Sequence, residues 1–374
     1  MTANKIILEK GALENLDSEI DKLNPQNVLV ISSNSLFKLG KLEHLLNYLK
    51  NTGITFDIFN EVMSEPTAEH IQSIRDEMNE TYDLVIGIGG GSVLDTTKII
   101  SVLLKNNVYV EDIIGKNLVK KDGVKTILIP STAGTGAEST PNAIVTLPEK
   151  KLKEGVISSK LYPDIVVLDS GLLTNLPKNV IAATGMDSFT HGIESYISNK
   201  ANGLSTIFSR ECMRLISQSI IDFYNDPENY ESGEKMLLAS MYGGMALSSA
   251  GTAAVHALAY PLGGTYGIAH GVANSMLLPH VMRFNFDEIQ DELIEVGKIM
   301  GLEHDEPSLA NAVIEKIEEW TSVLGIPQDL KEFGIKEDDI NELSYSASQV
   351  TRLLVNNPKE LTLNDIKNIY RKLI

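Results

Sequence analysis

The stretch LVIGIGGGSVLDTTK at residues 84–98 decides the fold class of this chain. Its first five residues are apolar at nearly every position, which is typical of a strand buried on both faces of a sheet. Three glycines follow, and a helical pattern runs from Val93 to Leu104, with Ser92 as the expected helix cap. Glycines let backbone N–H groups approach an anion at a helix N-terminus, so this turn is a candidate phosphate-binding loop.

The motif is neither of the two common phosphate-binding fingerprints. No Gly-Lys-Ser/Thr follows the glycines, as it would in a P-loop, and the spacing is not GxGxxG. A tight strand-to-helix turn without a ligand therefore stays open for this motif taken alone.

Further strands and helices alternate on both sides of this unit. Apolar runs predict strands at residues 27–31, 55–59 and 125–129, and helical spacing predicts helices at residues 37–49 and 68–78. Alternating strands and helices imply parallel pairing with right-handed crossovers. The first half is thus predicted to be an α/β domain with a mainly parallel sheet.

The alternation of strands and helices ends after the apolar run at residues 163–169. Long helical patterns then predict helices at residues 181–197, 205–224, 234–249, 308–324 and 338–354. We therefore expect an α/β domain over residues 1–176 and an all-α domain over residues 177–374, with a ligand-binding cleft between them.

Charge and cysteine content limit the function classes. The chain has 374 residues and a net charge of −18, so nucleic acid and anionic membrane surfaces would repel it. The single cysteine, Cys212, fits a reducing compartment and is predicted to be a half-buried helix residue, not a catalytic thiol. No signal-peptide core and no run of ~20 apolar residues is present, so we expect the cytoplasm.

One aspartate and three histidines form a candidate metal site. Asp187 and His191 are four residues apart in a helical segment and share a face, while His256 and His270 lie in apolar, small-residue surroundings. An acidic oxygen with imidazoles suits Fe²⁺ or Zn²⁺ better than Mg²⁺ or Ca²⁺. Each residue alone would more often be a core or helix-surface residue, and His280 is expected to be structural.

These motifs together resemble the iron-dependent (group III) alcohol dehydrogenases almost from end to end. The matching stretches are GGGSVLDTTK at 89–98, PSTAGTGAE at 130–138, ATGMDSFTHGIE at 183–194, and the segments at 254–270 and 270–280. The family implies a variant Rossmann domain, a helical domain, and a homodimer. It also implies an oxidoreductase that moves hydride between NAD(P)(H) and a small alcohol or aldehyde bound to Fe²⁺, with Zn²⁺ as the other candidate.

The resemblance also implies roles for single residues. The expected metal ligands are Asp187, His191, His256 and His270. The expected cofactor-binding residues are Gly89, Gly90, Gly91, Ser92 and Asp95 in the glycine loop, Thr132 and Thr135 in the next loop, and Lys153 near the adenine.

Two positions depart from the family pattern. The family often has a histidine four residues after the third ligand, where this chain has Tyr260. A phenol carries protons less well at neutral pH but can still contact a substrate, which leaves a substrate with an extra polar or anionic group open. Relatives that prefer NAD often have an acid after the first strand, where this chain has Ser33 within SSNS, so we predict that NADPH is accepted.

Three other functions compete with simple aldehyde reduction. One is reduction of a functionalised aldehyde of anionic or hydroxyacid type. A non-redox relative of the dehydroquinate synthase type should show a glutamate-led ligand set and a basic substrate site, whereas the first ligand position here is Asp187. A catalytically silent binding protein is disfavoured by the intact ligand set and glycine loop.

Overall fold

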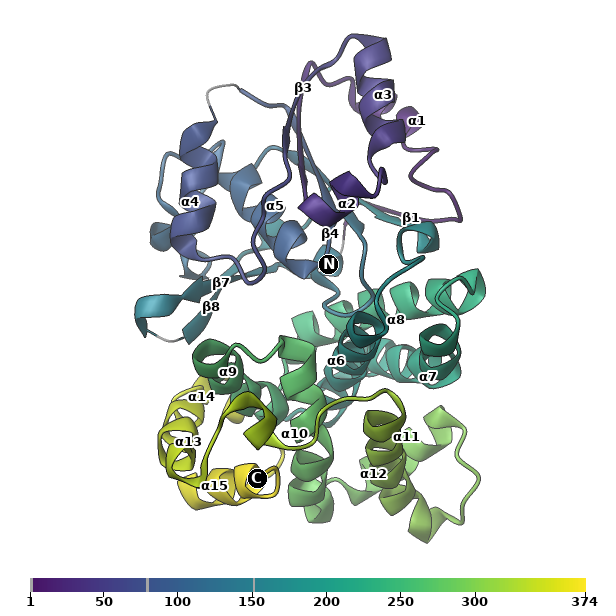
Figure 1. The fold of residues 1–374 in the computed structure, drawn as a ribbon, viewed down its shortest axis with the longest axis vertical. Coiled ribbons are helices and arrows are strands. Elements are labelled where there is room, and N and C mark those ends of the chain that lie inside the picture. Colours follow the sequence, from purple (N-terminus) through teal and green to yellow (C-terminus); the bar gives the residue numbers. More distant parts are fainter. Residues whose placement is uncertain (1–2, 79–80, 151) are drawn as a thin grey trace. The chain divides into compact units, whose positions relative to one another are not determined.

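The computed structural model describes residues 3–78, 81–150 and 152–374, which form two compact units. One unit comprises Met1–Thr132 and Gly136–Thr174, and the other comprises Ala133–Thr135 and Asn175–Ile374. Figure 1 shows the helices and strands of both units. None of the described helices has the length and apolarity that a membrane span requires.

The first unit is built on a six-stranded parallel sheet. Its strand order is β1 (Lys5–Leu8), β9 (Ile165–Leu168), β6 (Lys125–Pro130), β4 (Leu84–Gly89), β2 (Asn27–Ser32) and β3 (Thr55–Phe59). All neighbouring pairs are parallel, which confirms the predicted α/β fold. The edge strand β1 was not predicted, because it has only four residues and its short apolar run is mostly exposed. The strand at residues 27–31 is therefore the second strand, and the glycine loop follows the fourth.

Alternate residues of the central strands pack into two hydrophobic cores, one on each face of the sheet. Val28 and Val30 of β2 face one core, whereas Leu29 and Ile31 face the other. Helices α1 (Asp17–Leu23) and α3 (Glu43–Thr52) cover the first face, and α4 (Ala68–Glu77) and α5 (Gly91–Leu103) cover the second (Figure 1). Burial on both faces explains why these strands are apolar at every residue.

The single helix predicted over residues 37–49 is wrong. The structure has α2 (Asn34–Lys38) and α3 (Glu43–Thr52) with a turn between them. Leu39, which the pattern placed on the apolar face, is 65% exposed in that turn.

A small second sheet, which the sequence did not predict, extends the first unit. Strands β7 (Asn142–Leu147) and β8 (Leu152–Ile157) pair antiparallel, and β8 also pairs with the two-residue strand β5 (Gly115–Lys116). This hairpin carries Lys153, one of the expected cofactor residues.

The second unit is helical, and no strand occurs within residues 175–374, all of which are described. This confirms the all-α prediction. The helices are α6 (Lys178–Ile197), α7 (Gly203–Asn225), α8 (Tyr230–Ala250), α9 (Ala254–Tyr266), α10 (His270–Asn285), α11 (Gln290–Met300), α12 (Glu306–Val323), α13 (Ile340–Ser348), α14 (Thr351–Leu354) and α15 (Leu363–Arg371). The predicted helix at 338–354 is thus two helices, with a break at Gln349 and Val350.

Candidate metal centre and cofactor loops

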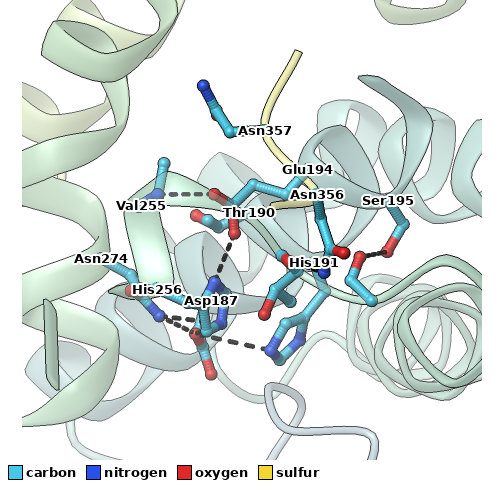
Figure 2. Close-up of polar contacts among 12 residues, drawn as sticks. Asp187, Thr190, His191, Glu194, Ser195, Val255, His256, Asn274, Asn356 and Asn357 are labelled. Atoms are coloured by element: carbon cyan, nitrogen blue, oxygen red, sulfur yellow. Dashed lines mark hydrogen bonds and ion pairs between the residues drawn. The ribbon is translucent and has the colours of Figure 1, made fainter. Parts of the chain in front are cut away.

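Three helices of the second unit bring the four expected metal ligands together. Asp187 and His191 lie one turn apart on α6, His256 lies in the first turn of α9, and His270 begins α10. One ligand atom from each residue can be chosen so that all four lie within 4.8 Å of one another. Figure 2 shows Asp187, His191 and His256 converging.

The spacing of these atoms is close to what one ion requires. Asp187 Oδ1 lies 3.9 Å from His191 Nε2, 3.8 Å from His256 Nε2 and 3.7 Å from His270 Nε2. Two ligand atoms bound ~2.1 Å from the same ion can be at most ~4.2 Å apart. A small contraction of the cluster would therefore let all four groups bind one ion, and their nitrogen and oxygen chemistry fits Fe²⁺ or Zn²⁺.

Burial and mutual charge favour the protonation states that bind metal. Burial alone would raise the pKa of Asp187, but electrostatic interactions with the three neighbouring histidines and a hydrogen bond from Asn274 hold that pKa below its ordinary value. Burial lowers the pKa of His191, which keeps its imidazole neutral. An ionised carboxylate and neutral imidazoles are the forms that act as ligands.

Glu194 orients one of these ligands, although the sequence analysis gave it no role. Its fully buried carboxylate lies 2.6 Å from His256 Nδ1 and also accepts a hydrogen bond of 2.6 Å from the Val255 backbone N–H (Figure 2). A proton on Nδ1, donated to Glu194, leaves the Nε2 lone pair free to face Asp187. The signal was present, because Glu194 lies seven residues after Asp187 on the same helix face.

Glu194→Gln is expected to weaken metal binding by about 10- to 100-fold. A glutamine offers one acceptor and one donor group where two N–H groups need acceptors, so either Val255 or His256 loses its partner. Competition with a chromogenic chelator measures the Kd for Zn²⁺, and Glu211→Gln on the outer part of α7 is the matched control. An unchanged Kd would show that Glu194 does not orient His256.

Asn274 is the second residue that the sequence analysis missed. Its Nδ2 donates to Asp187 Oδ1 at 2.7 Å and lies 3.2 Å from Nε2 of both His256 and His270. Its Oδ1 is buried with no hydrogen-bond partner among the described residues. The amide N–H thus points at the same three ligand atoms that a cation would contact. Asn274 lies one turn after His270 on α10, a spacing visible in the sequence.

Gly271 permits the close approach of α10 to α6. A Cβ atom at this position would lie 2.2 Å from the backbone oxygen of Ala183 and 3.3 Å from Asp187 Cβ. No side chain fits there without moving a helix. Glycine at position 271 therefore lets α10 lie close enough to α6 for His270 to reach Asp187.

Tyr260 lies beside the metal site on its more exposed side. It is half-buried on α9, and its ring centroid lies 6.0 Å from that of His270, whose side chain is 29% exposed. Its hydroxyl accepts a hydrogen bond of 3.3 Å from Arg352. Tyr260 is therefore placed where it can contact a substrate held at the site.

The remaining histidine and cysteine predictions have mixed outcomes. His280 on α10 lies outside the ligand cluster, and burial lowers its pKa. Cys212 is fully buried and not half-buried as expected, because it packs between α6 and α8 against Ser188 and Gly243. Burial raises the pKa of its thiol to about 12, so it is no nucleophile.

The glycine loop forms the start of α5 as the motif predicts, but its cap differs from expectation. Gly90 is the N-cap residue, and Ser92 does not cap the helix. The Ser92 hydroxyl instead accepts a hydrogen bond of 3.1 Å from the Glu65 N–H. Gly89 cannot carry a side chain, since a Cβ there would lie 2.5 Å from Val93 Cβ.

The other expected cofactor residues have varied surroundings. Asp95 is turned inward, where it accepts the Ile144 N–H at 2.9 Å and pairs with buried Lys98 at 2.9 Å. Lys153 pairs with Glu65 at 2.6 Å. Ser33 caps α2 by accepting a hydrogen bond of 3.4 Å from the Leu36 N–H.

Thr132 and Thr135 belong to different compact units. A Cβ atom at Gly90 would lie 3.4 Å from Thr132 Oγ1, so Thr132 borders the glycine loop. Thr135 groups with the helices of the second unit.

Glu138, in the loop that follows β6, is expected to make the stability of the protein depend on pH. Burial raises the pKa of this carboxyl to about 7. Between the ordinary pKa of 4.5 and about 7, the folded state binds more protons than the unfolded state, so stability falls as pH rises through this window.

Glu138→Gln removes this titration. The free energy of unfolding of the variant, relative to that of the parent, is therefore expected to rise by about 3 kcal/mol between pH 4.5 and pH 8. Urea unfolding at both pH values measures the change, and exposed Glu69→Gln is the control. A difference that does not vary with pH would contradict the assignment.

Comparisons with known proteins agree over the whole chain. The family model for iron-containing alcohol dehydrogenases matches residues 3–170, and the model for the C-terminal part of the same family matches residues 181–374. The chain is 34% identical over 367 residues to long-chain-alcohol dehydrogenase 1 of Geobacillus thermodenitrificans, covering 96% of this chain and 92% of that one.

Two further relatives extend the match to reductases and solved structures. Lactaldehyde reductase of Escherichia coli is 31% identical over 380 residues, with 98% of this chain and 99% of that one covered. A crystal structure of a 1,3-propanediol oxidoreductase superposes with a TM-score of 0.94 at 28% identity, covering 100% of this chain and 99% of that one. The chain belongs to the iron-containing alcohol dehydrogenase family.

Proposed function

We propose that this enzyme reduces small aldehydes to alcohols, uses NADPH as well as NADH, and depends on Fe²⁺ or Zn²⁺ held by Asp187, His191, His256 and His270. Family membership makes it a metal-dependent, NAD(P)-linked oxidoreductase of alcohols and aldehydes. The observation that carries the proposal is the convergence of those four side chains within 4.8 Å.

The residues of the second unit account for binding and orientation at the reaction centre. When bound, the ion supplies Lewis-acid polarisation of the substrate oxygen. Glu194 fixes the ring of His256, and Asn274 holds the carboxylate of Asp187. A reduced nicotinamide bound at the glycine loop would supply hydride to the aldehyde carbon and solvent would supply a proton to its oxygen, so the products would be an alcohol and the oxidised cofactor.

The proposed cofactor site uses the glycine loop and the cap of α2. Helix α5 (Gly91–Leu103) begins directly after β4 and is long enough for its N-terminus to favour a pyrophosphate. Ser33 follows β2, where an acid would repel a 2′-phosphate. Its neutral hydroxyl supports the use of NADPH.

Ser33→Asp is expected to shift the cofactor preference towards NADH. The added carboxylate would repel the 2′-phosphate, and we expect kcat/KM for NADPH to fall by about 10- to 100-fold while that for NADH changes little. Asn34→Asp is the matched control, because it adds the same negative charge one residue further along the chain, at the start of α2. A strong preference of the parent enzyme for NADH would overturn the proposed use of NADPH.

The proposal as a whole is tested by an aldehyde panel with each reduced cofactor. The protein is stripped of metal, reloaded with Fe²⁺ or Zn²⁺, and assayed by loss of absorbance of the reduced nicotinamide. We expect turnover only in the reloaded samples. Cofactor binding without turnover on any aldehyde would instead favour a silent binding protein. The homodimer, the cytoplasmic location and a cleft between the domains stay predictions.

A further inference from the structure

We propose that Arg352 binds an anionic group of the substrate, so that the preferred substrates are short-chain aldehydes that carry a carboxylate or a sulfonate. The inference rests on the proposed function, because it assumes that the aldehyde oxygen lies at the metal centre. It adds a specificity-determining residue and a substrate class to that reaction.

A continuous row of side chains leads from the metal centre to Arg352. Asp187 is buried at one end, and His270 follows with Nε2 at 3.7 Å from Asp187 Oδ1. The ring of Tyr260 lies 6.0 Å from the ring of His270, and the guanidinium carbon of Arg352 lies 5.6 Å from the centre of the Tyr260 ring. All these residues belong to the second unit, on α6, α9, α10 and α14.

Exposure increases along this row. The side chain of Asp187 is 4% exposed and that of His270 is 29% exposed, Tyr260 is half-buried, and Arg352 is exposed. Helix α14 packs on α9, and Figure 1 shows the two side by side. The His270 side is thus the more exposed side of the centre, and Tyr260 and Arg352 lie along it.

The positive charge of Arg352 has no acidic partner among the described residues. Its one recorded hydrogen bond goes to the Tyr260 hydroxyl. By contrast, four other arginines each lie within 4.0 Å of a glutamate, namely Arg210, Arg214, Arg283 and Arg371. Arg75 of α4 also has no carboxylate of a described residue within 4.0 Å, but it belongs to the first unit. Arg352 is thus the one arginine of residues 175–374, all of which are described, that pairs with no carboxylate, in a chain with 50 acidic residues and a net charge of −18.

Tyr260 explains how this arginine is positioned. Its hydroxyl accepts one of the five N–H donors of the guanidinium, and its ring lies beneath the cation. The remaining donors form a planar fork suited to two oxygens of a carboxylate or sulfonate. Tyr260 thus has a physical role, because it fixes the position of the Arg352 guanidinium relative to the metal centre.

The steps of 6.0 Å and 5.6 Å set the greatest separation of the His270 ring from the guanidinium carbon. An aldehyde at the metal centre therefore needs a spacer between its carbonyl and its anion that matches this separation, and 4-oxobutanoate and sulfoacetaldehyde offer two spacer lengths. A long apolar chain would place no charge near Arg352 and would gain nothing from it.

The experiment compares 4-oxobutanoate and sulfoacetaldehyde with uncharged butanal, in the metal-loaded enzyme and in Arg352→Gln. We expect the parent enzyme to prefer the anionic aldehydes. Arg352→Gln should lower kcat/KM for them by about 10- to 100-fold, mainly through KM, because a hydrogen-bonded charge partner is lost. Turnover of butanal should change far less, and Arg352→Lys should restore part of the loss.

Arg371→Gln serves as the matched control, since Arg371 is paired with Glu337. A parent enzyme that reduces butanal at least as well as both anionic aldehydes would overturn this inference alone. An equal loss on charged and uncharged aldehydes in Arg352→Gln would also overturn it. Failure of the parent to reduce any aldehyde would overturn the proposed function together with the inference.

Discussion

Replacing His256 with alanine is expected to lower turnover by about three orders of magnitude, because the substrate oxygen loses its Lewis acid. His256 is buried, and its Nε2 faces Asp187 while Nδ1 is held by Glu194. Truncation removes one ligand and leaves the Glu194 carboxylate buried without its imidazole partner. We therefore expect metal content to fall in parallel with turnover.

Cofactor binding provides the internal check on this variant, because the glycine loop belongs to the other unit. Fluorescence titration with NADPH should give a Kd close to that of the parent. His280→Ala on α10, outside the ligand cluster, is the matched control and should keep its metal. Full activity and full metal content in His256→Ala would refute the assignment of this histidine as a ligand.

Replacing Gly271 with alanine is expected to disrupt the site without changing any ligand. The new methyl group would lie 2.2 Å from the Ala183 backbone oxygen, so α10 must move away from α6. That movement carries His270, the neighbouring residue, away from Asp187. Overpacking of this kind costs about 1–3 kcal/mol, and a displacement of ~1 Å at a reaction centre costs about 100-fold in rate.

Thermal unfolding, metal titration and kcat together measure this effect. Gly203→Ala is the control, because nothing lies within 4 Å of a Cβ there and the residue is exposed at the start of α7. An intact metal Kd in Gly271→Ala would mean that the helices tolerate the methyl group and that their close approach does not set the site.

The central strands of the sheet could be predicted because they are buried on both faces. Strands β2, β4 and β6 carry apolar residues at nearly every position, and this pattern is local. Strand β1 is also mostly apolar, but its four residues are too short a run to indicate a strand, and three of them are exposed. The β7–β8 hairpin was missed as well, because each strand has only a short apolar run flanked by polar residues and the pairing of the two strands is not a local signal.

In the candidate site, too, neighbours on one helix could be predicted from the sequence, whereas contacts between residues far apart in the chain could not. Asp187 and His191 share a helix face, so their neighbourhood follows from spacing, and the family resemblance supplies His256 and His270. The contact between Glu194 and His256 joins residues 62 positions apart, and the contact between Asn274 and Asp187 joins residues 87 apart. No local pattern encodes such pairs, although each lies on the same helix face as a ligand.

Arg352 illustrates the limit most clearly. The sequence places it 92 residues after Tyr260, in a stretch with no recognisable motif. Only the packing of α14 on α9 brings the guanidinium onto the phenol. The sequence left an anionic substrate open, and the structure supplies the cation that would select it.

We propose that one cation is held jointly by Asp187, His191, His256 and His270. Anomalous diffraction from crystals of the iron-loaded protein, recorded on both sides of the iron absorption edge, tests this most directly. We predict a single strong peak about 2.0–2.2 Å from Asp187 and from Nε2 of the three histidines. A peak elsewhere, or none among these four side chains in crystals of active protein, would contradict the account.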